Sequence, residues 1–246
     1  MALNSLKLVL VLGVLGVAHV HGQDKDYLTL TSMEVVEVKK DFLNQEISER
    51  LSFSDLQRET EISASTNNKN MIPIVAVGQI IAATKELVAL GEGIYTLVQK
   101  GKPSINTNYA PISVVPRIGK KEYVDILETE NWTMPKRTTY VITYKNLYGM
   151  EVVKFRYSVI FSYGGTNQGK GAYITAAQII PVSILTSFGF DFSATMKLVA
   201  ITNHGTKENP VAGVLMSMQY TVETFLDATL KSYAYHITGR GGFKEY

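Results

Sequence analysis

Apolar and polar side chains alternate through residues 104–246, which is the pattern of β-strands with one buried face. In one strand, for example, Phe155 and Tyr157 lie on one face while Lys154 and Arg156 lie on the other. Six segments show this alternation: Arg137–Tyr144, Glu151–Phe161, Tyr173–Leu185, Phe190–Ile201, Val211–Leu226 and Thr229–Thr238. Most are joined by short polar turns, which require antiparallel neighbours. The pattern therefore predicts an antiparallel β-sandwich of six or more strands.

A transmembrane β-barrel is the competing all-β interpretation of the same alternation. Such a barrel usually needs at least eight strands and an outward face that is apolar throughout. The six segments and their polar faces favour the sandwich instead.

The chain between residues 23 and 103 has a different pattern, which predicts helices. Residues 23–70 are charged, and apolar side chains recur every three or four residues over Met33–Leu51, as in an amphipathic helix. Residues 71–103 are the most apolar stretch after the N-terminal segment, and Gly101 followed by Pro103 is typical of a helix end. The predicted fold class is therefore α+β: an N-terminal helical segment and a hydrophobic helix, followed by the β-sandwich.

The first 22 residues have the order of a secretory signal peptide. Lys7 precedes an apolar run, Leu8–Val20, and small or β-branched residues stand before the expected cut at Gln23. The apolar run is shorter than the roughly 20 residues that a membrane-spanning helix needs. We therefore expect an exported protein that is either secreted or held in the cell envelope.

Composition narrows the function classes. The absence of cysteine removes thiol nucleophiles, thiolate metal sites and iron–sulfur ligation, and in an exported chain it favours a bacterial setting. Lysine and arginine total 24 against 22 aspartate and glutamate, so removal of Lys7 leaves a net charge of +1 (24 − 1 − 22). This balance argues against nucleic acid as a partner, since such proteins carry a strong basic excess.

No motif predicts an enzyme, a metal or a cofactor. His204 and His236 are the only histidines after residue 22, and they lack metal-ligand spacing. The glycine-rich stretch Gly164–Gly171 lacks the Lys-Ser/Thr of a phosphate loop and lies between two strands, so it predicts a hairpin turn. A hydrolase that uses His204 or His236 remains a weaker alternative, because catalytic triads are defined by geometry. The acidic residues beside Trp132 could mark a sugar site, although a solvated loop explains them better.

The sequence therefore predicts an exported, non-enzymatic binding or structural protein, surface-associated or self-assembling through its tyrosine-rich sandwich. The expected partner is a protein or a second copy of the chain. The candidate contact residues are aromatic: Tyr144, Tyr157, Tyr163, Tyr233, Tyr235 and Trp132. The alternative is a membrane-active or pore-forming protein in which residues 71–98 form the inserting helix.

Overall fold

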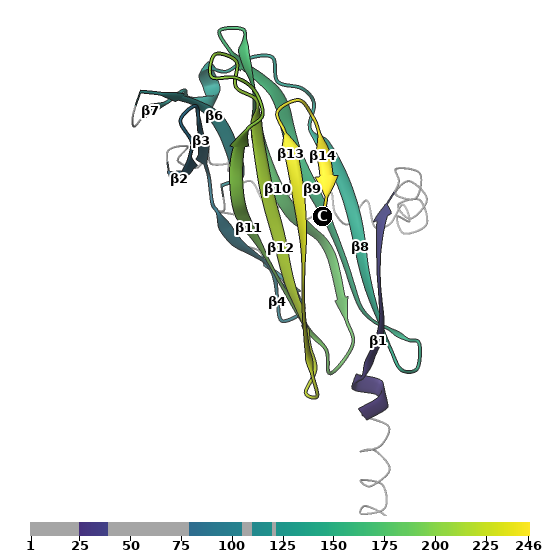
Figure 1. Ribbon diagram of the computed structural model, residues 1–246. Coiled ribbons are helices and arrows are strands. Elements are labelled where there is room, and N and C mark those ends of the chain that lie inside the picture. The colour runs from purple at the N-terminus through teal and green to yellow at the C-terminus, as the bar shows by residue number, and fades with distance from the viewer. Residues whose placement is uncertain (1–24, 39–78, 105–109, 120–121) are drawn as a thin grey trace, which may run out of the picture.

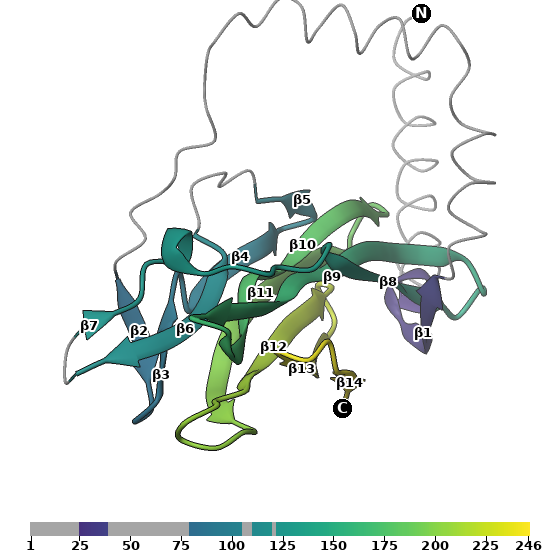
Figure 2. The same ribbon diagram turned by 90° about the horizontal axis from the view of Figure 1, so that it is seen from above.

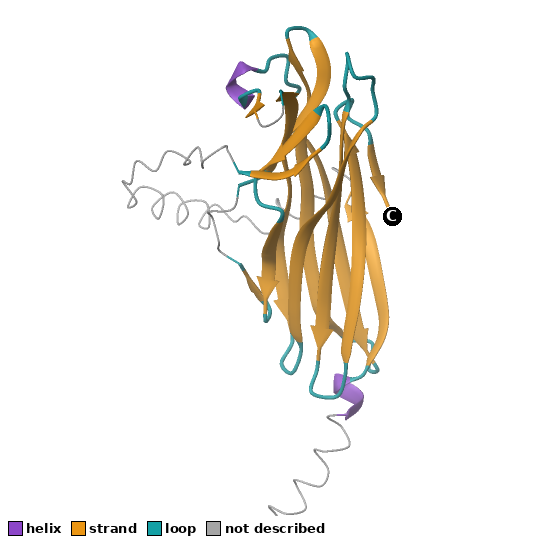
Figure 3. Ribbon diagram, turned by 60° about the vertical axis from the view of Figure 1, so that its left-hand side comes forward, coloured by secondary structure: helices purple, strands orange, loops and turns teal. Residues whose placement is uncertain are grey.

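Long antiparallel strands run the length of the molecule and form two facing sheets (Figures 1 and 2). The computed structural model describes residues 25–38, 79–104, 110–119 and 122–246. The hairpin turns gather at the two ends of the strands (Figure 3). Any surface built from turns therefore lies at one end or the other.

The first sheet has the order β1-β8-β9-β10-β6-β3-β2, and β7 pairs with β6 beside this path. All of these pairings are antiparallel. The strands are β1 (Leu30–Val38), β2 (Ile80–Ala83), β3 (Leu87–Leu90), β6 (Ile112–Ile118), β7 (Glu122–Tyr123), β8 (Lys136–Asn146), β9 (Glu151–Asn167) and β10 (Lys170–Thr186).

The second sheet has the order β14-β13-β12-β11-β4-β5 and is also antiparallel. Its strands are β4 (Ile94–Gln99), β5 (Lys102–Pro103), β11 (Asp191–Asn203), β12 (Ala212–Glu223), β13 (Ala228–Thr238) and β14 (Phe243–Glu245).

One core of buried side chains lies between the sheets. Phe155 of β9 meets Phe192 of β11 with ring centroids 4.9 Å apart, and Tyr140 of β8 meets Tyr235 of β13 at 5.6 Å. The alternation that predicted the sandwich thus places these rings inward, and the sandwich part of the prediction is confirmed. The predicted α+β class is wrong, because the described chain is nearly all antiparallel β-sheet. Each of the six predicted strands corresponds to one observed strand, from β8 to β13.

The predicted hydrophobic helix over residues 71–103 is wrong. Residues 71–78 lie outside the described part, and the remainder forms the short strands β2, β3, β4 and β5. All four residues of β3 are buried, because the strand is covered on both faces, and such a strand has no alternation to distinguish it from a helix. Lys100 and Gly101 both have positive φ, at 47° and 70°, so the expected helix end is a tight turn between β4 and β5.

The predicted N-terminal helical segment is also wrong where the structure describes it. Met33–Val38 belongs to β1, which pairs with β8 from Leu30↔Asn146 to Val38↔Thr139. The β-branched residues Val35, Val36 and Val38 suit a strand, and the backbone of β8 offers the pairing partner. Residues 39–51 of that helix and the predicted signal peptide, residues 1–22, lie outside the described residues.

Helix is limited to two short pieces in the described chain: one turn at residues 25–28 and a 3-10 turn, η1, at Ile126–Glu128. Neither has the length or the apolar content of a membrane-spanning helix.

Candidate functional site

Three of the aromatic residues predicted to form a contact surface lie inside the protein. Tyr144, Tyr157 and Tyr235 are buried between the sheets, while Tyr163 and Tyr233 are half-buried at the margin of the core. The Tyr157 and Tyr235 hydroxyls form a hydrogen bond of 2.6 Å across the core. Burial raises the pKa of both hydroxyls, so the pair stays neutral and joins the two sheets.

Trp132, the sixth predicted residue, is half-buried and packs on the backbone of β9. A Cβ at Gly165 would collide with the indole ring, and the indole Nε1 donates to Thr129 Oγ1 at 3.0 Å. The nearby Asp125 accepts a hydrogen bond from Leu127 N at 2.9 Å and so caps η1. Trp132 and Asp125 therefore have structural roles, and these contacts do not require the sugar site that the sequence offered as an alternative.

Six exposed apolar side chains of the described residues lie on three hairpin turns at one end of the sandwich, the lower end in Figure 1. These turns join β8 to β9, β10 to β11 and β12 to β13. We call the following residues the tip surface: Leu147, Tyr148, Met150, Phe188, Phe225 and Leu226. Phe188 is 95% exposed and Phe225 is 84% exposed, which is unusual for the largest apolar side chains.

Strand register brings the three turns to the same end. Thr186 pairs with Val153, and Ser187 N donates to Val152 O at 2.8 Å, which joins the first two turns. In the second sheet Glu223 pairs with both Asp191 and Ala228, which joins the second turn to the third. The tip surface is therefore one region built from chain segments far apart in sequence.

Polar side chains hold the backbone of the first and third turns. Asn146 Oδ1 accepts from Tyr148 N at 3.1 Å and from Met150 N at 3.0 Å. In the third turn Thr224 Oγ1 accepts from Asp227 N at 3.1 Å, and Asp227 Oδ1 accepts from Ala228 N at 2.7 Å. These polar contacts, rather than the exposed Leu and Phe side chains, are the usual means by which turns are stabilised.

The three turns at the opposite end have the usual polar character. They consist of Gln168 with Gly169, residues 204–211 and residues 239–242, where the exposed side chains are mainly charged or amide-bearing. The sequence carries a signal for this difference, because phenylalanine stands between residues that favour turns. The two cases are Ser187-Phe188-Gly189 and Thr224-Phe225-Leu226-Asp227. Sequence reasoning missed the tip surface because it assigned Phe225 and Leu226 to a strand and could not place the turns together.

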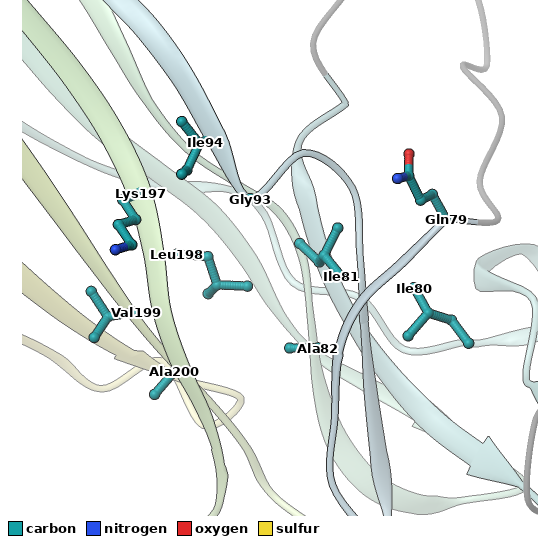
Figure 4. A pocket seen from close by; sticks show the side chains of 10 residues that line it. All are labelled: Gln79, Ile80, Ile81, Ala82, Gly93, Ile94, Lys197, Leu198, Val199 and Ala200. Atoms are coloured by element: carbon teal, nitrogen blue, oxygen red, sulfur yellow. The ribbon is translucent and has the colours of Figure 1, made fainter.

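An open groove of about 470 Å³ lies between β2, the start of β4 and β11 (Figure 4). Ile81, Ile94 and Leu198 contribute apolar side chains to it, and Lys197 contributes its charge. Its shallow apolar walls lack the convergent polar groups typical of a small-molecule site.

The structure brings together the two histidines that the sequence treated separately. His204 Nε2 lies 3.1 Å from His236 Nε2 and 2.9 Å from Thr202 Oγ1. Burial lowers the pKa of His236, and the charges of His204 and Lys244 lower it further. The described residues contain no cluster of three or more His, Cys, Asp or Glu suited to a metal ion.

Comparison with known proteins adds no relative: no family model, no curated protein and no solved structure matches this chain.

Proposed function

We propose that this is a non-enzymatic protein of the cell exterior that binds a lipid surface through its tip surface. The observation that carries the proposal is the full exposure of Phe188 and Phe225 on neighbouring turns at one end of an elongated sandwich. Exposed apolar patches on soluble proteins usually mark sites of interaction. Membrane activity is kept from the sequence-based alternative but assigned to turns, because the described part of residues 71–98 forms the strands β2, β3 and β4.

The composition of the tip surface suits the interfacial region of a bilayer. Phe and Leu side chains enter the apolar layer, while a tyrosine such as Tyr148 keeps its hydroxyl near the headgroups. Burial of one exposed Phe or Leu stabilises the bound state by about 1.5–3 kcal/mol. Several such residues acting together are enough for reversible membrane binding, as with other interfacial elements.

The shape of the tip surface favours a lipid surface over a protein partner. Its exposed apolar residues belong to three separate turns, and these turns lie at one end of the strands (Figure 3). A bilayer deforms around separate projections, whereas a protein partner would need a concave surface that matches all three. Backbone N–H groups of the first and third turns donate to the side chains of Asn146, Thr224 and Asp227, so entry into the bilayer would not leave them unpaired.

Charge does not favour anionic lipid. Charges of both signs lie around the turns. Glu151, Glu223 and Asp227 are acidic, whereas Lys145, Lys231 and Lys100, whose backbone N–H donates to Ser193 Oγ, are basic. The apolar contact is therefore the main driving force, and binding should persist at high salt and on neutral lipid.

Flotation with phosphatidylcholine vesicles tests the proposal. We expect the wild-type protein to float with the vesicles at 0.5 M salt. The Phe188→Ser/Phe225→Ser variant should have a binding constant for the vesicles that is lower by at least ~10-fold. A matched control is Leu127→Ser/Met134→Ser, which removes apolar side chains that are 78% and 86% exposed but belong to the segment around η1. The control should bind like wild type.

Two results would contradict the proposal. One is a failure of the vesicle assay to distinguish the proteins: either all three float equally, or the wild-type protein does not float with any neutral or anionic vesicle. The other is concentration-dependent self-association of wild type without vesicle binding, lost in the Phe188→Ser/Phe225→Ser variant, which would assign the tip surface to contact between copies.

A further inference from the structure

We propose that His204 and His236, with Thr202 beside them, form a surface site for a divalent transition-metal ion of the copper and zinc class. The site belongs to the second sheet, on its outer face, and it is independent of the tip surface. No part of the proposed membrane function requires it.

The distance between the two imidazoles fits a shared metal ion. Histidine nitrogen binds Zn²⁺ at about 2.0–2.1 Å, so an ion at that distance from two Nε2 atoms 3.1 Å apart makes an N–metal–N angle of roughly 100°. This value lies between the square-planar and tetrahedral angles that Cu²⁺ and Zn²⁺ adopt. Both rings then hold their proton on Nδ1 and direct the Nε2 lone pair to the ion.

Glycine at position 213 makes this approach possible. His204 lies just beyond β11, and its ring passes over Gly213 of β12 to reach His236 on β13. A Cβ at Gly213 would collide with His204 Nε2 and with Thr202 Oγ1. Gly213 has no positive φ, so the reason for glycine here is space for the imidazole rather than backbone conformation.

The surroundings keep the pair available to an ion. Thr202 Oγ1 lies 2.9 Å from His204 Nε2 and supplies an oxygen at the edge of the site, while water completes the coordination. The charge that opposes a bound cation is that of Lys244, the neighbour of His236 on strand β14. The neighbour of His236 on the other side, Leu215 of β12, is uncharged.

Calorimetric titration of the untagged protein with Cu²⁺ tests the site. We expect one Cu²⁺ per chain, no uptake of Mg²⁺, and a loss of affinity of at least about tenfold in either His204→Gln or His236→Gln. The double variant measures the background from other groups, including His19 and His21 in protein that retains its N-terminal segment. Electron paramagnetic resonance of the Cu²⁺ form should show two nitrogen ligands in wild type and one in each single variant.

Two further variants test the geometry. Gly213→Ala should lower Cu²⁺ affinity as much as His204→Gln does, because the new Cβ displaces the ring. Lys244→Gln should raise affinity by up to about fivefold, because it removes the opposing charge. Equal Cu²⁺ affinity in wild type and in the His204→Gln/His236→Gln double variant would overturn the proposal, whatever the vesicle experiment shows. Circular dichroism of each variant establishes that it is folded.

Discussion

Buried tyrosine hydroxyls are the residue-scale feature that most distinguishes this core. Tyr157 and Tyr235 satisfy each other through a 2.6 Å hydrogen bond, and Tyr95 Oη both donates to Ile179 O at 2.9 Å and accepts from Ile179 N at 2.8 Å. Tyr144 Oη is buried and makes no hydrogen bond of good geometry with the described residues. The Tyr220 hydroxyl, which is close enough to influence the pKa of Tyr144, donates to Met33 Sδ at 3.3 Å. Similar rings therefore have different energetic roles, set by whether the hydroxyl is paired.

This difference predicts that removal of the hydroxyl oxygen from Tyr157 and from Tyr144 will change stability differently. Tyr157→Phe should destabilise the protein by about 1–3 kcal/mol, because it leaves the buried Tyr235 hydroxyl unpaired. Tyr144→Phe keeps the packing and removes an unpaired polar atom, so the free energy of unfolding should change by less than ~0.5 kcal/mol or increase. Urea unfolding followed by circular dichroism measures both; equal losses in the two variants would contradict this account.

At the scale of elements, the structure depends on glycine where the two sheets meet. Gly239 follows β13 in the second sheet; its N–H donates to Ala212 O at 2.7 Å, and its carbonyl accepts from Gly164 N of β9 at 2.9 Å. A Cβ at Gly239 would collide with the carbonyl of Ala172 in β10. The turn after β13 therefore brings backbone of the second sheet directly against the first.

Alanine at this turn should be costly. Gly239→Ala should lower the free energy of unfolding by at least ~2 kcal/mol, because the atom that it meets belongs to rigid backbone. Gly93→Ala is the matched control: its Cβ would meet only Ile81, at 3.9 Å, and we expect a change within about 0.5 kcal/mol. Thermal unfolding of both variants measures the difference, and similar midpoints would argue against a close contact between the sheets.

For the whole molecule, the many buried tyrosines predict how stability depends on pH. Burial raises the pKa of Tyr140, Tyr157, Tyr220 and Tyr235, and the Glu245 carboxylate raises the pKa of Tyr140 and Tyr235 further. In the unfolded chain a tyrosine titrates near pH ~10, whereas the folded protein holds these protons. The stabilisation is present below pH ~10 and is lost as the pH rises above it.

We therefore expect a cooperative alkaline transition above pH ~10. Tyrosinate absorbance at 295 nm should rise together with the loss of the far-ultraviolet circular dichroism signal, because the buried hydroxyls ionise only on unfolding. Full tyrosinate absorbance in a protein that keeps its circular dichroism would show that these hydroxyls are accessible in the folded state.

Much of the sheet structure could be predicted from the pattern of residues alone. The clear two-residue period of β8 to β13 exists because each strand has one face in the core, as with Phe155 and Tyr157 against Lys154 and Arg156. Where that condition fails, prediction failed. Strand β3 is buried on both sides, and in Met33–Val38 the apolar spacing fitted a helix while the partner strand was unknown.

Sequence by itself thus determined the sandwich, its six long strands, the absence of thiol chemistry and the expectation of an export signal. Only the tertiary structure decided which tyrosines are core and which apolar residues lie on the tip surface. The physical reason is that local pattern reports which side of a strand is buried, whereas position depends on pairing between distant segments. Register through Thr186↔Val153 and Asp191↔Glu223 gathers the apolar turns at one end. Register between β11, β12 and β13, with glycine at 213, brings His204 to His236.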